Sequence, residues 1–434
     1  MTTETIFIED GRVIDPATGT DGVRTVVLRD GKVAEVAERL ERPRDVRAVD
    51  ARGRWVTPGF IDLHVHLREP GQEYKETVAT GARAAVAGGF TAVVAMPNTK
   101  PVNDTLAVTE LVLARAAAAG LARVYPCGAI SKGSAGEELA EYGELKAGGC
   151  VALSDDGKPV MSPALMRRAL EYARAFGLPL TVHEEDLHLV GKGVMHEGAA
   201  ATRLGLKGIP GQAEEVMVLR DLALAELTGG RLHIAHVSSA GTVRALREAK
   251  RRGLAVTAEV TPHHLALTDE DVAASGYSTD FKMNPPLRSA ADVKACVEGL
   301  ADGTIDCIAT DHAPHSAVEK DVEFDAAANG IVGLETAFPV CLALVTRGLL
   351  TERRLIEALT AGPARAFGLP GGTLAAGAPA DVAVLDPKAA WRCEPAALHS
   401  KSTNTPWKGR TLTGRCTHAF VGGRLVHEGG KENR

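Results

Sequence analysis

Short apolar runs recur through the middle of the chain, and longer segments with helix-like spacing separate them. The eight runs cover residues 60–63, 91–95, 123–129, 150–153, 179–182, 231–235, 255–260 and 305–310. Apolar runs of this length, bounded by turn residues, predict buried strands. Because most runs are followed by a helical pattern, the alternation predicts a (β/α)₈ barrel. An open, doubly wound sheet would show the same alternation, so the positions of the polar residues must decide between the two.

Four of the intervening segments carry clear helix signals. Residues 105–119, 212–227 and 291–300 have helical spacing. A fourth helix is predicted to begin at Ser162-Pro163, because serine is a favoured N-cap and proline fits the first helical position. These helices fall between predicted strands, as the barrel requires.

The two ends of the chain follow a different pattern. Residues 6–9 and 25–36 read as strands, with a hairpin turn at Asp30-Gly31. Residues 380–385 predict another strand, and residues 418–426 predict a second hairpin. We therefore expect a small β-sandwich built from residues 1–57 and 366–434, and a barrel built from residues 58–365.

The composition narrows the range of partners. The 434 residues are 45% hydrophobic and 24% charged, with a net charge of −6, so we expect no surface for nucleic acid. No apolar stretch reaches the length of a bilayer span, and residues 1–5 lack the features of a signal peptide. The seven cysteines form no C-x-x-C pair, which is typical of a reducing compartment. We expect a cytoplasmic protein that binds no membrane.

Polar side chains follow most of the predicted strands. In a (β/α)₈ barrel the carboxyl ends of the strands meet at one rim, where active sites lie. The residues at these positions that could bind a metal or donate hydrogen bonds are His64, His66, Asn98, Asp156, His183, His236 and Asp311. Their repeated placement after strands favours the barrel over the open sheet.

Four of these residues are histidines and two are aspartates, which are zinc-ligand types. His64 and His66 are two residues apart on a strand, so both face the barrel mouth. Each histidine alone is more often a buried core residue, and each aspartate more often a helix cap. Together they would be costly to bury unpaired, and one or two metal ions would satisfy them. The predicted ligands are His64, His66, Asp156, His183, His236 and Asp311. Zinc suits this mixed set, although cobalt and manganese are tolerated, and two ions are favoured over one.

This ligand set predicts hydrolysis of an amide, or its reverse. Zinc lowers the pKa of a bound water to about 7 and polarises a carbonyl. Asp311 could then carry a proton from the nucleophile to the leaving nitrogen.

Other polar residues suggest the shape of the substrate. Arg68, two residues after His66, could hold a carboxylate in a bidentate fork, although most arginines are simply exposed. Asn98 and Asn284 could face an imide or ureido edge, or could be turn residues beside proline. His315 could bind an anion or cap a loop. His263 and His264 are interpreted as supporting or structural residues.

Several separated motifs resemble those of one family. The segments Gly59-Phe-Ile-Asp-Leu-His64-Val-His66-Leu-Arg68-Glu-Pro-Gly and Ala309-Thr-Asp311-His-Ala-Pro-His315 are similar to the two signatures of class I bacterial dihydroorotases. Met96-Pro-Asn98-Thr, Lys282-Met-Asn284-Pro-Pro and Gly330-Ile-Val-Gly also resemble blocks of that family. The resemblance covers nearly the whole chain and places it in the amidohydrolase superfamily.

The resemblance implies a zinc enzyme of de novo pyrimidine synthesis that interconverts N-carbamoyl-L-aspartate and L-dihydroorotate. It implies that His64 and His66 bind one metal, that His183 and His236 bind the other, and that Asp311 is both a ligand and the catalytic acid/base. It also implies that an aspartate bridges the metals, and spacing favours Asp156 over Asp155. The implied substrate contacts are His66, Arg68, Asn98, Asn284, His315, Asn329 and Gly330. Relatives associate with aspartate carbamoyltransferase, and the resemblance admits that partner and a homodimer.

The chain departs from relatives at two places. Hydantoinases and many others bridge their metals with a carboxylated lysine, where this chain has Asp155-Asp156. The family usually has Phe-Gly where this chain has Asn329-Gly330. Two other functions stay open at this stage. One is hydrolysis of hydantoin or allantoin, and the other is a non-catalytic scaffold, which would be expected to lack the histidines.

Overall fold

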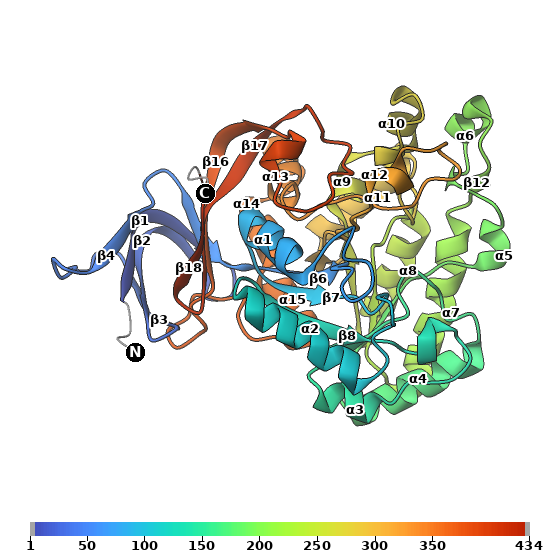
Figure 1. The fold of residues 1–434 in the computed structure, drawn as a ribbon, viewed down its shortest axis with the longest axis horizontal. Coiled ribbons are helices and arrows are strands. Elements are labelled where there is room, and N and C mark those ends of the chain that lie inside the picture. The colour runs from blue at the N-terminus through green and yellow to red at the C-terminus, as the bar shows by residue number, and fades with distance from the viewer. Residues whose placement is uncertain (1–4, 430–434) are drawn as a thin grey trace.

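The computed structural model describes residues 5–429 and contains a barrel with a β-rich unit beside it (Figure 1). The eight parallel barrel strands are β6 (Phe60–Val65), β7 (Phe90–Ala95), β8 (Arg123–Gly128), β9 (Ala152–Leu153), β10 (Leu180–Val182), β13 (Leu232–Ile234), β14 (Val256–Val260) and β15 (Cys307–Ile308). Each predicted apolar run overlaps one of these strands, so the barrel prediction is confirmed. The strands follow one another in chain order from β6 to β15.

The segment after β15 closes the barrel against its first strand. His312 forms a parallel bridge with Val65, and its carbonyl accepts the His66 N–H at 2.9 Å. The buried Asp62 carboxylate accepts the N–H groups of His64 (3.1 Å) and Thr310 (3.0 Å). These bonds hold the first and last strand ends, and therefore their polar side chains, side by side.

Helices surround the strands. The longer ones are α1 (Val78–Gly88), α2 (Leu106–Ala119), α4 (Pro163–Ala175), α7 (Gln212–Thr228), α8 (Ala240–Arg251), α11 (Ala290–Ala301), α13 (Ala337–Thr346) and α14 (Glu352–Leu359). The shorter elements are α3 (Tyr142–Ala147), α5 (Leu187–Val190), α6 (Ala199–Leu204), α9 (Pro262–Ala266), α10 (Asp269–Ala274), α12 (Ala317–Lys320), α15 (Ala361–Phe367), the 3₁₀ turns Lys132–Ser134, Thr279–Phe281 and Pro395–Ala397, and the strand pair β11 (Met195–His196) and β12 (Gly208–Ile209). The four predicted helices are present. Ser162 caps α4 by accepting the Leu165 N–H at 3.2 Å.

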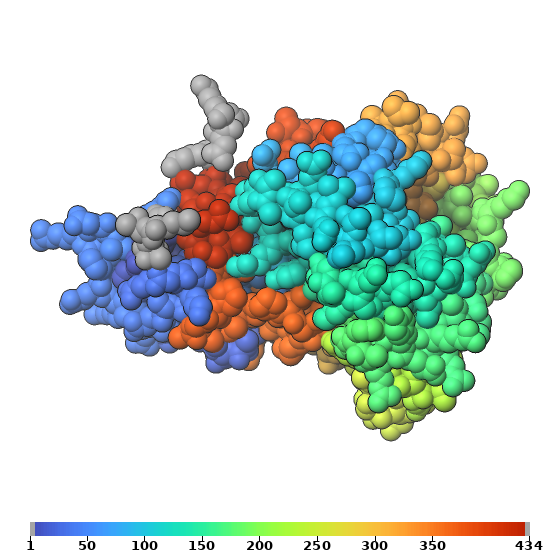
Figure 2. All heavy atoms as spheres, turned by 60° about the horizontal axis from the view of Figure 1, so that its bottom comes forward, coloured from blue at the N-terminus to red at the C-terminus, as the bar shows by residue number. Residues whose placement is uncertain are grey.

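The two ends of the chain meet in one hydrogen-bonded sheet. Its strands are β1 (Ile6–Asp15), β2 (Thr20–Arg29), β3 (Lys32–Ala37), β4 (Arg47–Asp50), β5 (Trp55–Pro58), β16 (Val382–Arg392), β17 (Thr411–Val421) and β18 (Arg424–Glu428). The antiparallel pairing of β5 with β16 joins the N-terminal strands to the C-terminal ones. Figure 2 shows the N-terminal and C-terminal segments together on one side of the molecule. Residues 1–4 and 430–434 of the predicted β-rich unit lie outside the described residues.

The connection 393–410, between β16 and β17, runs back to the barrel. The Asn404 carbonyl accepts the N–H of Val332, and the Lys401 N–H donates to the buried Glu76 carboxylate. The C-terminal segment of the chain therefore contacts the barrel through this connection as well as contributing strands to the sheet. Within residues 5–429, no helix has the length and apolar character needed to cross a bilayer.

Candidate metal centre

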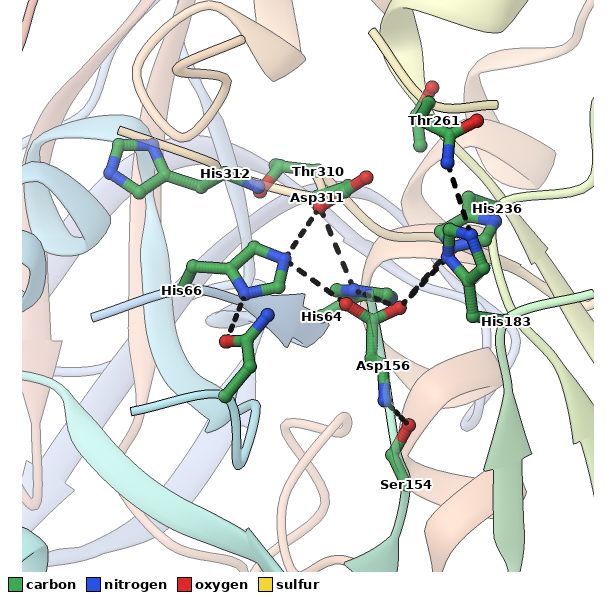
Figure 3. A network of polar contacts seen from close by, with 12 residues as sticks. His64, His66, Ser154, Asp156, His183, His236, Thr261, Thr310, Asp311 and His312 are labelled. Atoms are coloured by element: carbon green, nitrogen blue, oxygen red, sulfur yellow. Dashed lines mark hydrogen bonds and ion pairs between the residues drawn. The ribbon is translucent and has the colours of Figure 1, made fainter. Parts of the chain in front are cut away.

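Six predicted ligands converge at the barrel mouth (Figure 3). His64 and His66 extend from β6, Asp156 from the loop after β9, His183 from the end of β10, His236 from the end of β13, and Asp311 from the segment after β15. Within the described residues, two groups have ligand atoms that all lie within 4.8 Å of one another: His64, Asp156 and His236, and His64, His66 and Asp311. All of these side chains are buried.

Asp156 lies at the centre of the cluster. Its Oδ1 atom is 3.3 Å from Nε2 of His64, 3.3 Å from Nε2 of His236 and 3.4 Å from Nδ1 of His183. Its Oδ2 atom is 3.5 Å from Nε2 of His66. One carboxylate therefore lies between all four histidines.

Asp155 points elsewhere, although it is the neighbouring residue. Its Oδ1 atom accepts the Ser131 N–H at 3.0 Å, and its Oδ2 atom accepts the Ser131 hydroxyl. The side chain is buried among these donors, away from the histidines. The geometry therefore favours Asp156 as the bridging carboxylate.

Strained backbone directs several of these side chains. The backbone φ angles of His236, Asp311 and Arg68 are 32°, 46° and 63°, which residues other than glycine rarely adopt. Residues held in this way cluster at active sites, where surrounding structure compensates the cost.

The donor set fits a metal ion. Nε2 of His64 is buried without a hydrogen-bond partner, although it lies 3.3 Å from Asp156 and 3.6 Å from Asp311. Burial favours a neutral His64, but Asp156 and Asp311 raise its pKa well above the ordinary value by drawing a proton onto it. A divalent cation would supply that positive charge instead and release the proton.

A second layer of contacts orients the predicted ligands. Nδ1 of His64 lies 2.8 Å from Oε1 of Glu259, whose other oxygen is 3.1 Å from Nε2 of His233. Nδ1 of His66 lies 2.9 Å from Oδ1 of Asn98. A partner on the second ring nitrogen fixes the orientation of a metal-binding histidine.

A cavity of about 260 Å³ opens beside the cluster. Its lining includes the predicted substrate contacts His66, Arg68, Asn98, Asn284, His315 and Asn329. Arg68 is buried and lines the cavity, and its Nε–H donates to the Pro314 carbonyl at 3.1 Å. The cavity therefore combines a wall of candidate metal ligands with a cationic wall.

Comparisons with known proteins identify the family. A family model described as "Dihydro-orotase-like" matches residues 53–242, and one described as "Amidohydrolase family" matches residues 203–427. A dihydroorotase from Anaeromyxobacter sp. (strain K) is 85% identical over 99% of this chain and 100% of that protein. A dihydroorotase from Geotalea daltonii is 55% identical over 98% of this chain and 99% of that protein.

The chain belongs to the dihydroorotase family of the amidohydrolase superfamily.

Solved structures of related amidohydrolases share the fold. An L-hydantoinase from Arthrobacter aurescens superposes with a TM-score of 0.88 at 25% identity, covering 99% of this chain and 97% of that one. A D-hydantoinase from Thermus sp. gives a TM-score of 0.80 at 25% identity, with coverage of 98% and 96%. The resemblance to dihydroorotases seen in the motifs is therefore confirmed at the level of family and fold.

The backbone of the Asn329-Gly330 pair is tightly constrained. The Gly330 N–H donates to the Lys282 carbonyl at 3.0 Å, so it is already engaged within the protein. A Cβ atom at Gly330 would lie 2.5 Å from the Ala313 carbonyl oxygen, which explains the glycine. Asn329 lines the cavity, so its side chain is the part of this pair best placed to reach a ligand.

Sequence reasoning missed several residues that support the dihydroorotase site. Glu259 was detectable in principle, because a charged residue inside an apolar strand is unusual and needs a partner. Glu185 accepts the Asn284 amide at 3.2 Å, and Lys75 and Asn404 contact His315. These last three residues lie in loops without periodicity and carry no local signal. Of the histidines treated as supporting, His264 bonds to Thr261 and to the Pro285 carbonyl.

Proposed function

We propose that the chain is a zinc enzyme that interconverts N-carbamoyl-L-aspartate and L-dihydroorotate. The observation that carries this proposal is one cavity with two unlike walls. One wall is formed by four of the six proposed ligands, His66, Asp156, His183 and Asp311, which cluster with His64 and His236. The other wall presents Arg68 and His315, which suit a carboxylate. A hydantoin ring has no carboxylate for the second wall to bind.

The residues that would hold zinc are His64, His66, Asp156, His183, His236 and Asp311, and Asp156 is the carboxylate that two ions would share. Zinc, when bound, polarises a carbonyl and acidifies a water at neutral pH. Burial opposes the ionised form of Asp156, but His64, His183 and His236 hold its pKa well below the usual range. The carboxylate is therefore in the form that binds a cation.

The chain's own residues orient the substrate. Oδ1 of Asn98 accepts a hydrogen bond from Nδ1 of His66, so the Asn98 NH₂ group is left to donate to the substrate. Nδ2 of Asn284 donates to Glu185 and to His183, so the side-chain carbonyl oxygen of Asn284 is left to accept from the substrate. The two amides thus offer opposite polarity to a ureido edge, which itself carries both N–H and C=O groups.

Asp311 is proposed to move the proton. One oxygen lies 2.9 Å from Nε2 of His66, which anchors the carboxylate at the mouth. In hydrolysis it would hold the nucleophile's proton and pass it to the ring nitrogen that leaves, and in cyclisation the transfer would run the other way. His66 and His64 also hold the pKa of Asp311 below its usual range despite burial.

The cellular setting is also proposed. All seven cysteines are free and buried, which suits the reducing cytoplasm.

Val216, Leu219 and Leu227 are exposed apolar side chains on α7 that could face a second copy of the chain in a homodimer. We also propose domain boundaries at 57/58 and 365/366. Sedimentation of the chain alone and with aspartate carbamoyltransferase tests both associations.

The decisive experiment is a side-by-side assay of dihydroorotate, hydantoin and allantoin, with metal content measured on the same sample. We expect zinc in the protein, and turnover of dihydroorotate above that of both alternatives. Faster turnover of hydantoin would contradict the substrate. Full activity after chelation, with no bound metal, would contradict the zinc mechanism, and no activity with bound zinc would favour a scaffold.

A further inference from the structure

His315 lies between two cationic side chains at the edge of the cavity. Its Nε2 atom is 3.3 Å from Nη2 of Arg68, and its Nδ1 atom is 3.4 Å from Nζ of Lys75. Guanidinium and ammonium groups can only donate hydrogen bonds, whereas a neutral imidazole has one donor and one acceptor nitrogen. The ring can therefore accept from only one of its two neighbours.

The ring itself is neutral in this setting. Burial and the positive charges of Arg68, Lys75 and Lys320 lower the pKa of His315 to about 3, against a smaller opposing effect of Glu319. The proton on the ring must therefore be on either Nδ1 or Nε2, and the neighbours decide which.

Lys75 is fixed in place on the Nδ1 side. Its Nζ atom is 2.6 Å from Oε1 of Glu319, and its backbone carbonyl accepts the Ser402 hydroxyl at 2.7 Å. The Glu319 carboxylate is itself held by the Ser316 N–H at 3.0 Å. Glu319 lies farther from Nδ1, at 3.8 Å, so the nearer group is the ammonium donor.

The backbone of His315 is fixed as well. Its N–H donates to Oδ1 of Asn404 at 3.0 Å, and the Asn404 NH₂ group donates to the carbonyls of Ala313 and Gly330. The backbone from which the ring extends is therefore held in place beside the two cations.

We propose that Lys75 is a positioning residue that holds His315 as the Nε2–H tautomer, so that Nε2–H and Arg68 donate together to the substrate carboxylate. The inference rests on the proposed function for the identity of that carboxylate. When Nδ1 accepts from Lys75, the Nε2–H and Arg68 N–H groups lie 3.3 Å apart with no acceptor between them. An anion that accepts from both resolves this conflict, so the pair is prepared for a carboxylate.

The test removes the ammonium and keeps its aliphatic stem. In Lys75→Met we expect KM for dihydroorotate to rise about tenfold, the size expected when a charge-assisted hydrogen bond is weakened, with kcat within about twofold. Lys75→Arg retains a donor and should recover part of the loss. Zinc content should not change in either variant.

The matched control is Lys250→Met. Lys250 also makes a 2.6 Å ion pair, with Asp306, but that pair precedes β15 at the opposite end of the barrel from the rim. This variant should lower thermal stability without changing KM. A comparable rise in KM in the control would mean that general destabilisation explains the effect.

A direct readout separates positioning from a merely structural role. Nitrogen-15 NMR of histidine-labelled protein distinguishes the two tautomers, and His315→Gln identifies the signal by its loss. We expect an Nε2-protonated ring in the wild type and a shift toward the Nδ1-protonated form in Lys75→Met. An Nδ1-protonated ring in the wild type, or an unchanged KM in Lys75→Met, would overturn the proposal. The tautomer is read without substrate, so it tests Lys75 even if the wild type fails to turn over dihydroorotate, a failure that would refute the proposed function instead.

Discussion

Two clusters of histidine and carboxylate side chains among the described residues differ in how their lone pairs are used. At the barrel mouth, ring nitrogens of four histidines surround Asp156 at 3.3–3.5 Å. Near the β-rich unit, Glu335 lies beside His399 and accepts both its Nδ1–H (2.8 Å) and its backbone N–H (2.7 Å). The His427 ring is next to His399, with centroids 5.9 Å apart.

The difference shows that the same residue types make different sites. Glu335 has its oxygens engaged by N–H donors, so its charge is already satisfied inside the protein. Asp156 is approached mainly by ring nitrogens that could all bind a metal instead. A metal site therefore depends on unsatisfied lone pairs that point at a common centre, and the number of histidines nearby is a poor guide to it.

The largest expected effect follows from removing the proposed proton carrier at the mouth. Asp311→Asn should lower kcat by about 10²–10⁴-fold, the usual contribution of general acid–base catalysis, measured with added zinc. The matched change in the second cluster, Glu335→Gln, should leave kcat within about twofold. Equal losses in the two variants would remove the distinction between the clusters.

The next prediction separates the neighbouring aspartates. Asp156→Asn should lose bound zinc, measured by elemental analysis after desalting, because its carboxylate lies between the histidines. Asp155→Asn should retain zinc but unfold at a lower temperature, because Ser131 would lose its charged acceptor. Zinc loss in Asp155→Asn to the same extent would mean that the bridge is assigned to the wrong residue.

A smaller effect is expected behind the ligands. Glu259→Gln should weaken zinc binding by about 10–100-fold, since the carboxylate orients His64 through Nδ1. Competition with a chelator of known affinity measures this loss. His399→Gln removes a histidine from the second cluster and should leave zinc affinity unchanged; a parallel drop there would argue for a general loss of structure.

The smallest effect concerns the second cluster and pH. Burial, with help from His399 and Arg415, lowers the pKa of His427 to about 4, below the ordinary 6.5 of an unfolded chain. Between these values the unfolded state binds the proton more readily, so this histidine reduces stability as pH falls from 6.5 toward 4. His427→Gln should lessen the drop in Tm between pH 7.5 and pH 5.5 by about 1–2 °C. An unchanged or steeper drop would show that the wild-type ring is not held neutral.

Much of the fold could be predicted because the pattern repeats. Eight apolar runs specify eight strands, and a barrel brings the residues after them to one rim, so His64, His183, His236 and Asp311 could be placed together without coordinates. Periodicity alone could not decide between Asp155 and Asp156, and only the motif spacing in the family resemblance favoured Asp156. β9 spans only Ala152–Leu153, which is too short to fix which face the following residues occupy.

The supporting residues were beyond prediction for a different reason. Glu259 meets His64 across 195 positions of sequence, and Asn404 meets His315 across 89. Such pairs are set by how the strands and the connection 393–410 come together in space. A single sequence gives the identity of each residue, but it does not indicate which distant residue that side chain will contact.

The path of the connection 393–410 has a consequence for the order in which the site can be completed during synthesis. Every barrel strand and every proposed ligand is made before Ser400 and Asn404 leave the ribosome. Until then Glu76, fully buried in the finished protein, lacks the Ser400 and Lys401 donors that satisfy it. The loops carrying His315 and Gly330 also lack the Asn404 side chain that ties them together. The wall of candidate metal ligands could therefore form early in synthesis, whereas the cationic wall with Arg68 and His315 would be completed last.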